Sequence, residues 1–328
     1  MPFLDLPLAD LESYVADTRE PDDLDAFWRR TLADSRAAGG AVQVSPVDTG
    51  LTAVTVDDVI FPGFAGDPVR AWLTRPAGAT GALPVIVELV GYGGGRGMPH
   101  EHTLWATAGF AHLVMDTRGQ GSAWGNGGAT PDPHGSGPAT PGYLTRGLES
   151  PEQHYYRRVV TDGVRAVDAV AQIEGLDASR VVVKGISQGG GLALGVAGLA
   201  RGLCGVLADV PFLAAFERAV AITDERPYGE LRQWLSVHRD GAAQALATLA
   251  YVDAANLGTR ADAPALMSVA LMDNVCPPST VYTAYNRYAG PKEIDVYPYN
   301  GHEGGQQHRF PRQLAAVRRW VGPDRHAR

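Results

Sequence analysis

Short, almost continuous runs of apolar residues recur along the chain from about residue 84 onward. They cover 84–90, 110–115, 181–184, 206–210, 266–271 and 294–297. Runs without a polar side are typical of strands buried on both faces, as in a parallel sheet. Between them lie segments with helical spacing of apolar positions, at about 100–108, 157–174, 188–200 and 306–321. This alternation predicts an α/β fold with a doubly wound, mostly parallel sheet and helices on both of its faces.

The part of the chain before the first of these runs has a different pattern. Residues 1–40 are expected to form an N-terminal arm and a helix, which the Asp pair at 22–23 caps. Two stretches of alternating polarity follow, 54–60 and 69–74, with a Gly-Asp turn between them. Alternating stretches joined by a turn predict an antiparallel hairpin at one edge of the sheet.

Two segments interrupt the alternation of strands and helices. Residues 122–151 are rich in Gly and Pro, and a loop of this length is usually functional or part of an interface, with a flexible insertion as the alternative. Residues 212–258 form a helical excursion between two predicted strands, and we expect it to act as a cap over the site. The chain shows no internal repeat, so residues 1–328 are expected to form a single α/β domain.

Composition and charge exclude several classes of partner. The chain of 328 residues is 45% hydrophobic and 20% charged, with a formal net charge of −8 and no run of Lys or Arg. Nucleic acids and anionic membranes are therefore not expected as partners. The N-terminus lacks a basic start, and no stretch approaches the roughly 20 apolar residues of a membrane span. The two cysteines, Cys204 and Cys276, give no disulfide framework, so we expect reduced thiols and a cytoplasmic protein.

The clearest chemical signal is a serine between two glycines. Residues 185–189 read Gly-Ile-Ser-Gln-Gly, directly after the strand predicted at 181–184 and at the start of the helix predicted at 188–200. A strand, a sharp turn and a helix are the setting of the nucleophile elbow of α/β hydrolases. The helix N-terminus brings a partial positive charge to the oxyanion that would form there. Ser187 is thus the candidate nucleophile, and a glycine turn with an incidental serine is the alternative.

A serine nucleophile needs a base and an acid that orients the base. Of the nine histidines, only His302 lies in a loop between the last predicted strand and the final helix, where this fold delivers its base. Asp273 follows the strand at 266–271, and the order Ser187, Asp273, His302 is the one expected for the fold. Asp209 and Asp116 also end strands and are rivals for the role of the acid.

The oxyanion also requires two backbone N–H donors. One is expected from Gln188, the residue after the nucleophile, and the other from Tyr92 in the Gly-Tyr-Gly-Gly-Gly loop at 91–95. This loop lacks the Lys-Ser/Thr of a phosphate-binding loop. A zinc protease with His302 as a metal ligand would need a second histidine four residues later, where this chain has Gln306. The predicted chemistry needs no metal and no cofactor.

Three motifs carry a resemblance to a known family. They are Arg-Gly-Gln-Gly at 118–121, Gly-Ile-Ser-Gln-Gly-Gly at 185–190, and His302 followed by Glu303. Longer stretches that agree as well are 115–122, 154–158, 209–212, 271–278, 285–286 and 290–293. With these residues the chain resembles the acetyl xylan esterase / cephalosporin-C deacetylase family of carbohydrate esterases, in the α/β-hydrolase superfamily.

This resemblance implies deacetylation of small acetylated sugars, such as xylo-oligosaccharide acetates, and of antibiotic esters of the cephalosporin C type. It assigns the nucleophile, acid, base and oxyanion donors to the residues already named, and a structural role near the site to Arg118, Gln120 and Glu303. It also implies a homohexamer with the active sites facing an internal cavity. A broad short-chain carboxylesterase or a peptidase on the same fold is the alternative activity, and a non-catalytic binding protein is the alternative of another class.

Overall fold

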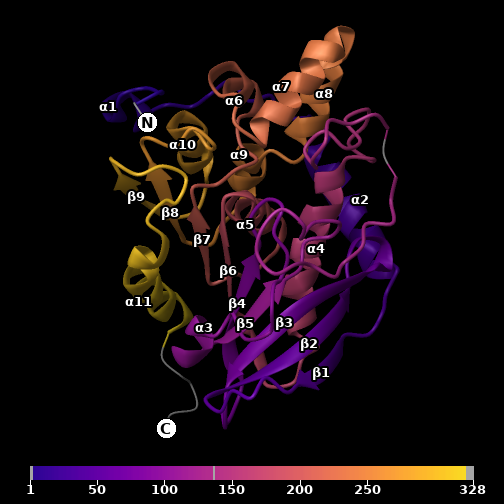
Figure 1. The fold of residues 1–328 in the computed structure, drawn as a ribbon, viewed down its shortest axis with the longest axis vertical. Coiled ribbons are helices and arrows are strands. Elements are labelled where there is room, and N and C mark those ends of the chain that lie inside the picture. The colour runs from indigo at the N-terminus through magenta and orange to yellow at the C-terminus, as the bar shows by residue number, and fades with distance from the viewer. Residues whose placement is uncertain (1–2, 136, 323–328) are drawn as a thin grey trace.

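One mixed sheet organises the molecule (Figure 1). The computed structural model describes residues 3–135 and 137–322; the first two residues of the predicted arm, residue 136 of the predicted loop, and residues 323–328 lie outside this part. Nine strands follow one another in the order β1-β2-β3-β5-β4-β6-β7-β8-β9. They are β1 (Gln43–Val47), β2 (Val54–Pro62), β3 (Pro68–Pro76), β4 (Leu83–Leu89), β5 (Ala111–Met115), β6 (Leu176–Ile186), β7 (Gly205–Asp209), β8 (Ala265–Ala270) and β9 (Lys292–Tyr297).

The six strands from β4 onward run parallel. Each of the apolar runs predicted from residue 84 onward forms one of them, which confirms the α/β fold with its mostly parallel sheet. The run at 181–184 is only the end of a longer strand, since β6 begins at Leu176 with polar and partly exposed residues that no apolar pattern reveals.

The other edge of the sheet is antiparallel. β2 and β3 form the predicted hairpin, and β3 pairs antiparallel with β5. The sequence pattern gave no sign of β1, which pairs with β2 outside the hairpin. Its side chains are almost all exposed and Pro46 interrupts it, so it has no buried face to produce alternation. Proline is tolerated in such a strand because one side of an edge strand needs no hydrogen bonds.

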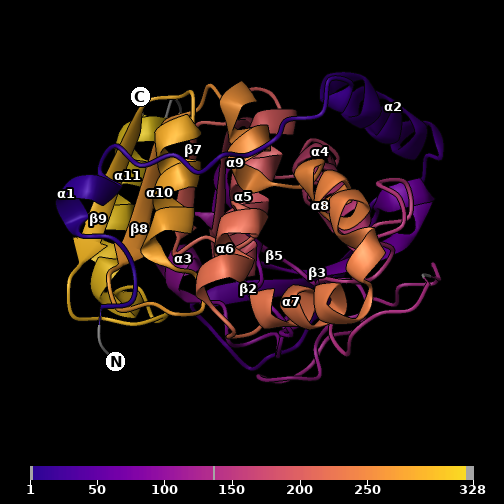
Figure 2. The ribbon, with the colours of Figure 1, turned by 90° about the horizontal axis from the view of Figure 1, so that it is seen from above.

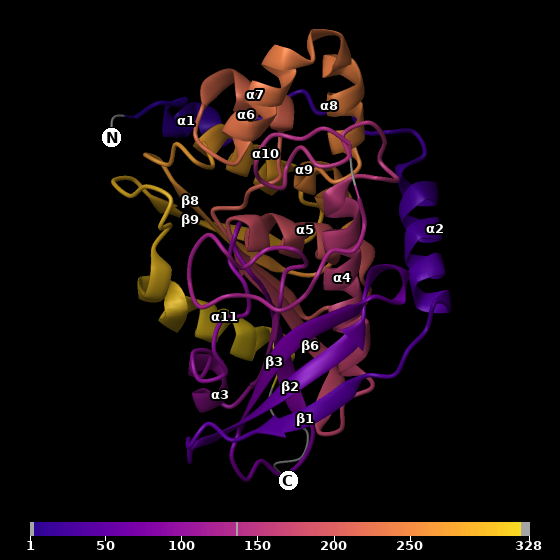
Figure 3. The same cartoon turned by 45° about the vertical axis from the view of Figure 1, so that its right-hand side comes forward.

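Helices cover both faces of the sheet, as Figure 3 shows. On one face a small apolar cluster joins the strands to α3 (Leu104–Thr107) and α11 (Phe310–Val321). On the other face the main core includes α2 (Leu24–Ala37), α4 (Tyr155–Val170), α5 (Gln188–Leu199), α9 (Ala254–Leu257) and α10 (Pro278–Arg287). A short helix, α1 (Leu8–Leu11), lies in the N-terminal arm.

Three helices differ from the sequence-based expectation. The helix expected over about 100–108 is limited to the four residues of α3. Asp23 does precede α2 at the N-cap position, but its side chain makes no capping bond and instead accepts a hydrogen bond from the Tyr251 hydroxyl. α10 was not predicted; it starts at Pro278, whose fixed φ suits the first turn of a helix.

The segment 212–258 lies between β7 and β8 and is helical. It contains α6 (Phe216–Ile222), α7 (Tyr228–Val237), the 3-10 turn η2 (Arg239–Gly241) and α8 (Ala242–Ala250), followed by α9. The part with α6, α7 and α8 and the turns between them, which we call the cap, lies beyond the carboxyl ends of the parallel strands (Figures 1 and 2). In the part of the chain that the structure describes, no helix combines the length and the apolar character needed to cross a membrane.

Candidate active site

Ser187 lies at the tip of a sharp turn between β6 and α5. Its backbone has φ 57° and ψ −118°, a conformation that L-residues rarely adopt. Three backbone hydrogen bonds hold it: its N–H donates to Asp209 O over 2.9 Å, and its carbonyl accepts from Gly191 over 3.0 Å and from Phe212 over 2.9 Å. A Cβ on Gly189 would lie 2.0 Å from the carbonyl oxygen of Leu89 at the end of β4, so α5 can approach β4 this closely only with glycine there.

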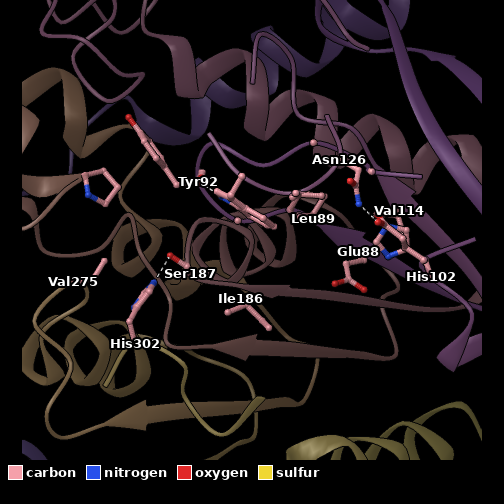
Figure 4. A pocket seen from close by; sticks show the side chains of 18 of the residues that line it. Glu88, Leu89, Tyr92, His102, Val114, Asn126, Ile186, Ser187, Val275 and His302 are labelled. Carbon is pink, nitrogen blue, oxygen red and sulfur yellow. Dashed lines mark hydrogen bonds between the residues drawn. The ribbon is translucent and has the colours of Figure 1, made fainter. Parts of the chain in front are cut away.

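The three residues predicted as nucleophile, base and acid meet at the carboxyl ends of β6, β8 and β9. Nε2 of His302 lies 2.9 Å from Ser187 Oγ, and Nδ1 of His302 lies 2.8 Å from Asp273 Oδ2 (Figure 4). Asp273 is 2% exposed, and its other oxygen accepts from the backbone N–H groups of Val275 and Cys276 over 2.8 and 2.9 Å. These bonds fix the carboxylate so that one oxygen faces the imidazole.

The two rival acids are engaged elsewhere. Asp209 accepts a hydrogen bond from Gln313 Nε2 over 2.8 Å, and burial raises the pKa of this carboxyl. Asp116 accepts hydrogen bonds from the backbone N–H groups of three residues, Arg96, Ala129 and Thr130. Neither carboxylate is hydrogen-bonded to His302, so neither orients the imidazole.

Of the two candidate oxyanion donors, Tyr92 lines the pocket of the serine and Gln188 directly follows the serine in the chain. Ser187 and His302 line the same pocket, and Gln188 begins α5. Among the described residues, no hydrogen bond occupies the backbone N–H of Tyr92 or of Gln188. Both donors are therefore free for a ligand, which is what an oxyanion hole requires.

Gln120 of the Arg-Gly-Gln-Gly motif links the loops that carry these two donors. Its Oε1 accepts the backbone N–H of Gly93 over 2.7 Å, and its Nε2 donates to Gln188 Oε1 over 2.9 Å. Gln188 Nε2 in turn donates to the carbonyl of Val90 over 3.0 Å. The motif glutamine thus keeps the glycine loop and the elbow at a fixed separation.

Arg118 and Glu303, the other two residues given a structural role, lie in very different surroundings. Arg118 has no exposed surface and forms a bidentate pair with Asp162 of α4, over 2.6 and 2.8 Å, together with a bond of 2.9 Å to Asp67. It therefore joins α4 to the η1 turn (Phe64–Gly66) region. Glu303 is exposed and accepts from Asn300 Nδ2 over 2.8 Å, a contact that holds the pKa of its carboxyl below the usual value.

The pocket in front of Ser187 has a volume of about 620 Å³. The cap contributes Arg226 and Pro227 to its wall, and the Gly- and Pro-rich loop at 122–151, called the long loop below, contributes Trp124 and Asn126. Trp124 is 53% exposed, and its Nε1 donates to the carbonyl of Tyr92 over 2.6 Å. Sequence patterns did not indicate Trp124, although an exposed tryptophan in a long Gly-rich loop is the kind of residue that contacts ligands.

Glu230 of α7 is a second residue that the sequence did not reveal. Its carboxylate is 2% exposed and accepts a hydrogen bond from the Tyr92 hydroxyl over 2.6 Å. The backbone N–H groups of Tyr143 and Leu144 donate to the same oxygen over 3.2 and 3.3 Å. One side chain thus connects the cap, the long loop and the residue that carries an oxyanion donor.

One group of residues in the described part of the chain could supply three metal ligands. Atoms of Asp273, Cys276 and His302 lie within 4.8 Å of one another. Metal ligands must be deprotonated, but burial raises the pKa of the Cys276 thiol well above its usual value. Nδ1 of His302 is also engaged with Asp273. These residues fit an acid–base pair better than a metal centre.

Comparison with known proteins agrees with this geometry. The family model described as acetyl xylan esterase (AXE1) matches residues 1–319. The acetyl esterase Axe7A of Xylanibacter ruminicola is 30% identical over 294 residues, which are 87% of this chain and 64% of that protein. The chain therefore spans less than two thirds of the length of this relative.

Two solved structures are similar over their whole length. An acetyl xylan esterase from Paenibacillus sp. R4 is 38% identical, with a TM-score of 0.89, and the match covers 95% of this chain and 99% of that one. Acetyl xylan esterase 1 from Thermoanaerobacterium sp. JW/SL YS485 is 30% identical, with a TM-score of 0.88 and coverages of 95% and 98%.

A more distant structure shares only the fold. The acylaminoacyl peptidase of Pyrococcus horikoshii has a TM-score of 0.58 at 14% identity, and the match covers 83% of this chain and 41% of that one. The resemblance carried by the three sequence motifs is thus confirmed by a family match over nearly the whole chain and by two full-length structural relatives. On these grounds the chain belongs to the acetyl xylan esterase family, a group of carboxylic ester hydrolases with the α/β-hydrolase fold.

Proposed function

We propose that this protein is a serine esterase that removes acetyl groups from small acetylated substrates, including acetylated xylo-oligosaccharides and acetates of the cephalosporin C type. The observation that carries the proposal is the continuous chain of hydrogen bonds Ser187–His302–Asp273, of 2.9 and 2.8 Å, at the edge of a pocket. A serine within hydrogen-bond reach of a base that a third group orients is the arrangement of an activated nucleophile.

In the acylation step, Ser187 Oγ attacks the acetyl carbonyl carbon while His302 Nε2 takes the hydroxyl proton. Negative charge moves to the carbonyl oxygen, where the free N–H groups of Tyr92 and Gln188 stabilise it. Asp273 accepts a hydrogen bond from Nδ1 of the imidazole and stabilises its charged form. When the carbon–oxygen bond of the ester breaks, His302 Nε2 returns the proton to the alcohol, which leaves.

Deacylation repeats these steps with water in place of the alcohol. His302 takes one proton from the water as the oxygen attacks the acetyl-serine, and it gives this proton to Ser187 Oγ when acetic acid leaves; the acid then loses its own proton to the solvent. Each group ends in its starting state, so this chain's own residues complete the cycle.

Hydrolysis of p-nitrophenyl acetate by wild type and Ser187→Ala tests the chemistry. The variant is expected to lose turnover by a factor of about 10⁶, the size seen when a triad nucleophile is removed elsewhere. A fluorophosphonate probe should label the wild type at Ser187 and leave the variant unlabelled. Substantial activity in the variant, or labelling at another residue, would contradict the proposal.

A panel of substrates separates the proposed deacetylase from the other activities of this fold. Acetyl esters should be hydrolysed with much higher kcat/KM than butyryl and longer esters of the same alcohol. A flat profile would indicate a broad carboxylesterase, and cleavage of peptide substrates would indicate a peptidase. The two full-length structural relatives are acetyl xylan esterases, which supports acetylated xylan fragments as the class from which to choose the alcohols.

The proposal extends to assembly and location. A homohexamer with active sites facing an internal cavity would restrict entry to small substrates, and static light scattering of the purified protein tests it. A cytoplasmic location is expected from the two free cysteines, and fractionation of cells that express the native gene tests that part.

A further inference from the structure

A cluster of charged side chains lies on the face of the sheet that α3 and α11 cover. Glu88 of β4 and Lys184 of β6 are partners in register, and Lys184 Nζ lies 2.6 Å from Glu88 Oε1. The other oxygen of Glu88 lies 2.8 Å from His112 Nε2. Two residues earlier on each of these strands, the same face carries Ile86 and Val182, which belong to the apolar cluster under α3 and α11. The polarity of this face therefore changes at the carboxyl ends of the strands.

Packing alone does not explain this change. Removing an ion from water costs several kcal/mol even when it is paired, and an apolar pair of similar volume would continue the pattern already present. Burial would raise the pKa of Glu88, but the Lys184 ammonium and the bond from His112 hold it well below its usual value, so this carboxylate is ionised. Asp209, at the end of β7, is only 4% exposed, and its Oδ1 makes no hydrogen bond but lies 3.3 Å from the guanidinium of Arg309.

These groups line a chamber of about 350 Å³. Its polar wall contains carboxylates, an ammonium, imidazoles and amides, and its apolar wall contains two aromatic rings, Trp105 and Phe310. The volume falls within the roughly 300–1,000 Å³ typical of small-ligand sites. The chamber is therefore large enough for a small polar molecule or one unit of a larger one.

The chamber adjoins the pocket of Ser187. Four residues, Glu88, Glu101, His102 and Ile186, line both spaces. Ile186 directly precedes the nucleophile and is 37% exposed, and Figure 4 shows its side chain between Ser187 and the end of the pocket where Glu88 and His102 lie. A substrate bound at Ser187 can reach the chamber by extending over Ile186.

We propose that this chamber is a second subsite, which binds a neighbouring sugar unit of the alcohol part of an acetylated oligosaccharide. The inference rests on the proposed esterase function and deepens it. Sugar hydroxyls both donate and accept hydrogen bonds, and the chamber offers acceptors on Glu88 and Gln307 and donors on Lys184 and Gln307. The aromatic wall suits the apolar C–H face of a sugar ring.

The charge of the chamber argues for a neutral ligand. The Glu88 carboxylate is paired with Lys184, and Asp209 lies 3.3 Å from the guanidinium of Arg309. Burial lowers the pKa of His112, so its imidazole is neutral near pH 7. The buried charges are thus paired with opposite charges, and the remaining carboxylate of the lining, Glu101, is exposed to solvent. A polyhydroxylated ligand therefore fits better than an anion or a cation.

The first test is competitive inhibition of p-nitrophenyl acetate hydrolysis by unacetylated sugars. A second subsite predicts that xylobiose inhibits wild type at least threefold more strongly than xylose does, because only the disaccharide reaches the chamber. Equal inhibition constants for the two sugars would overturn the proposal. Retained esterase activity in the same assay shows that the proposed function stands even if the subsite does not.

The second test compares two variants on one 3-10 turn, η4 (Gln306–Arg309). Gln307→Ala removes a polar group that lines the chamber, whereas His308→Ala changes an exposed neighbour that does not line it. We expect Gln307→Ala to weaken inhibition by xylobiose relative to xylose by about three- to tenfold, the loss of one hydrogen bond. His308→Ala should keep the wild-type ratio. An unchanged ratio in Gln307→Ala would refute the assignment.

Discussion

Removing the Glu230 carboxylate is expected to slow catalysis without touching the serine, the histidine or the aspartate. Glu230 accepts the Tyr92 hydroxyl over 2.6 Å and two backbone N–H groups of the long loop. The Tyr92 hydroxyl itself accepts the N–H of Tyr143 over 2.6 Å. In Glu230→Ala, Tyr92 loses the bond that anchors its side chain to the cap, so its backbone N–H is held less firmly toward the pocket.

The expected decreases in kcat and in the free energy of unfolding follow from the hydrogen-bond donors that lose Glu230 as their acceptor. Loss of an entire oxyanion donor costs about 10²–10³ in kcat. A donor that stays in place but moves more should cost less, and we expect kcat to fall by about 10- to 100-fold, or about 1.4–2.7 kcal/mol in the barrier. The Tyr92 hydroxyl and the Leu144 N–H lose their acceptor, whereas the Tyr143 N–H keeps the Tyr92 oxygen. Each buried donor without a partner costs about 1–3 kcal/mol, so the free energy of unfolding should fall by about 2–6 kcal/mol.

Steady-state hydrolysis of p-nitrophenyl acetate and urea unfolding measure the two effects separately. Glu230→Gln keeps the shape and one acceptor for Tyr92, so it should recover part of kcat. Glu217→Ala is the matched control, since Glu217 is an exposed glutamate of the cap on α6. If Glu230→Ala loses stability but keeps kcat within twofold of wild type, Glu230 only supports the cap and the reasoning about Tyr92 is wrong.

Three further outcomes test other parts of the molecule: the Arg118 ion pair, the choice of acid, and Asp253, the buried N-cap residue of α9. Arg118→Met leaves the fully buried Asp162 without its bidentate partner and should lower the free energy of unfolding in urea by about 3–5 kcal/mol. Asp273→Asn should lower kcat by a factor of about 10⁴, as loss of the orienting acid does in other triads, while Asp209→Asn should lower kcat far less. The reverse result would show that Asp209, and not Asp273, is the acid. Burial raises the pKa of Asp253 to about 6, so the folded state binds this proton more tightly than the unfolded state. The stability of wild type relative to Asp253→Asn should therefore decrease by up to about 3 kcal/mol as the pH rises from about 4 to above 6, and urea unfolding across this range measures it.

The sequence predicted best those parts of the structure that depend on residues close together along the chain. The apolar runs predicted all six strands from β4 onward, because buried strands leave a short local signature. The elbow around Ser187 was predictable for the same reason, since strand, turn and helix are contiguous. His302 and Asp273 could be selected because the fold delivers them in a fixed order, and the structure brings both to the serine.

Contacts between distant segments could not be predicted. Glu230 lies 138 residues from Tyr92 along the chain, and nothing in the helical pattern of α7 indicates that one of its glutamates is buried. Trp124 lies in a loop whose path depends on the residues around it. Glu88 did leave a signal, a glutamate inside an apolar run, but its meaning depends on Lys184, which becomes its neighbour only when β4 and β6 pair.

The backbone conformation of Ser187 serves catalysis but lowers the stability of the folded protein. Its positive φ costs about 1–3 kcal/mol for a residue other than glycine, and glycine would adopt the same angles freely. The three hydrogen bonds that hold this residue all use backbone atoms, so none of them depends on the serine side chain. Selection for heat resistance alone would thus favour glycine at position 187 and discard the enzyme's activity. Any effort to stabilise this protein by library screening has to select for turnover at the same time.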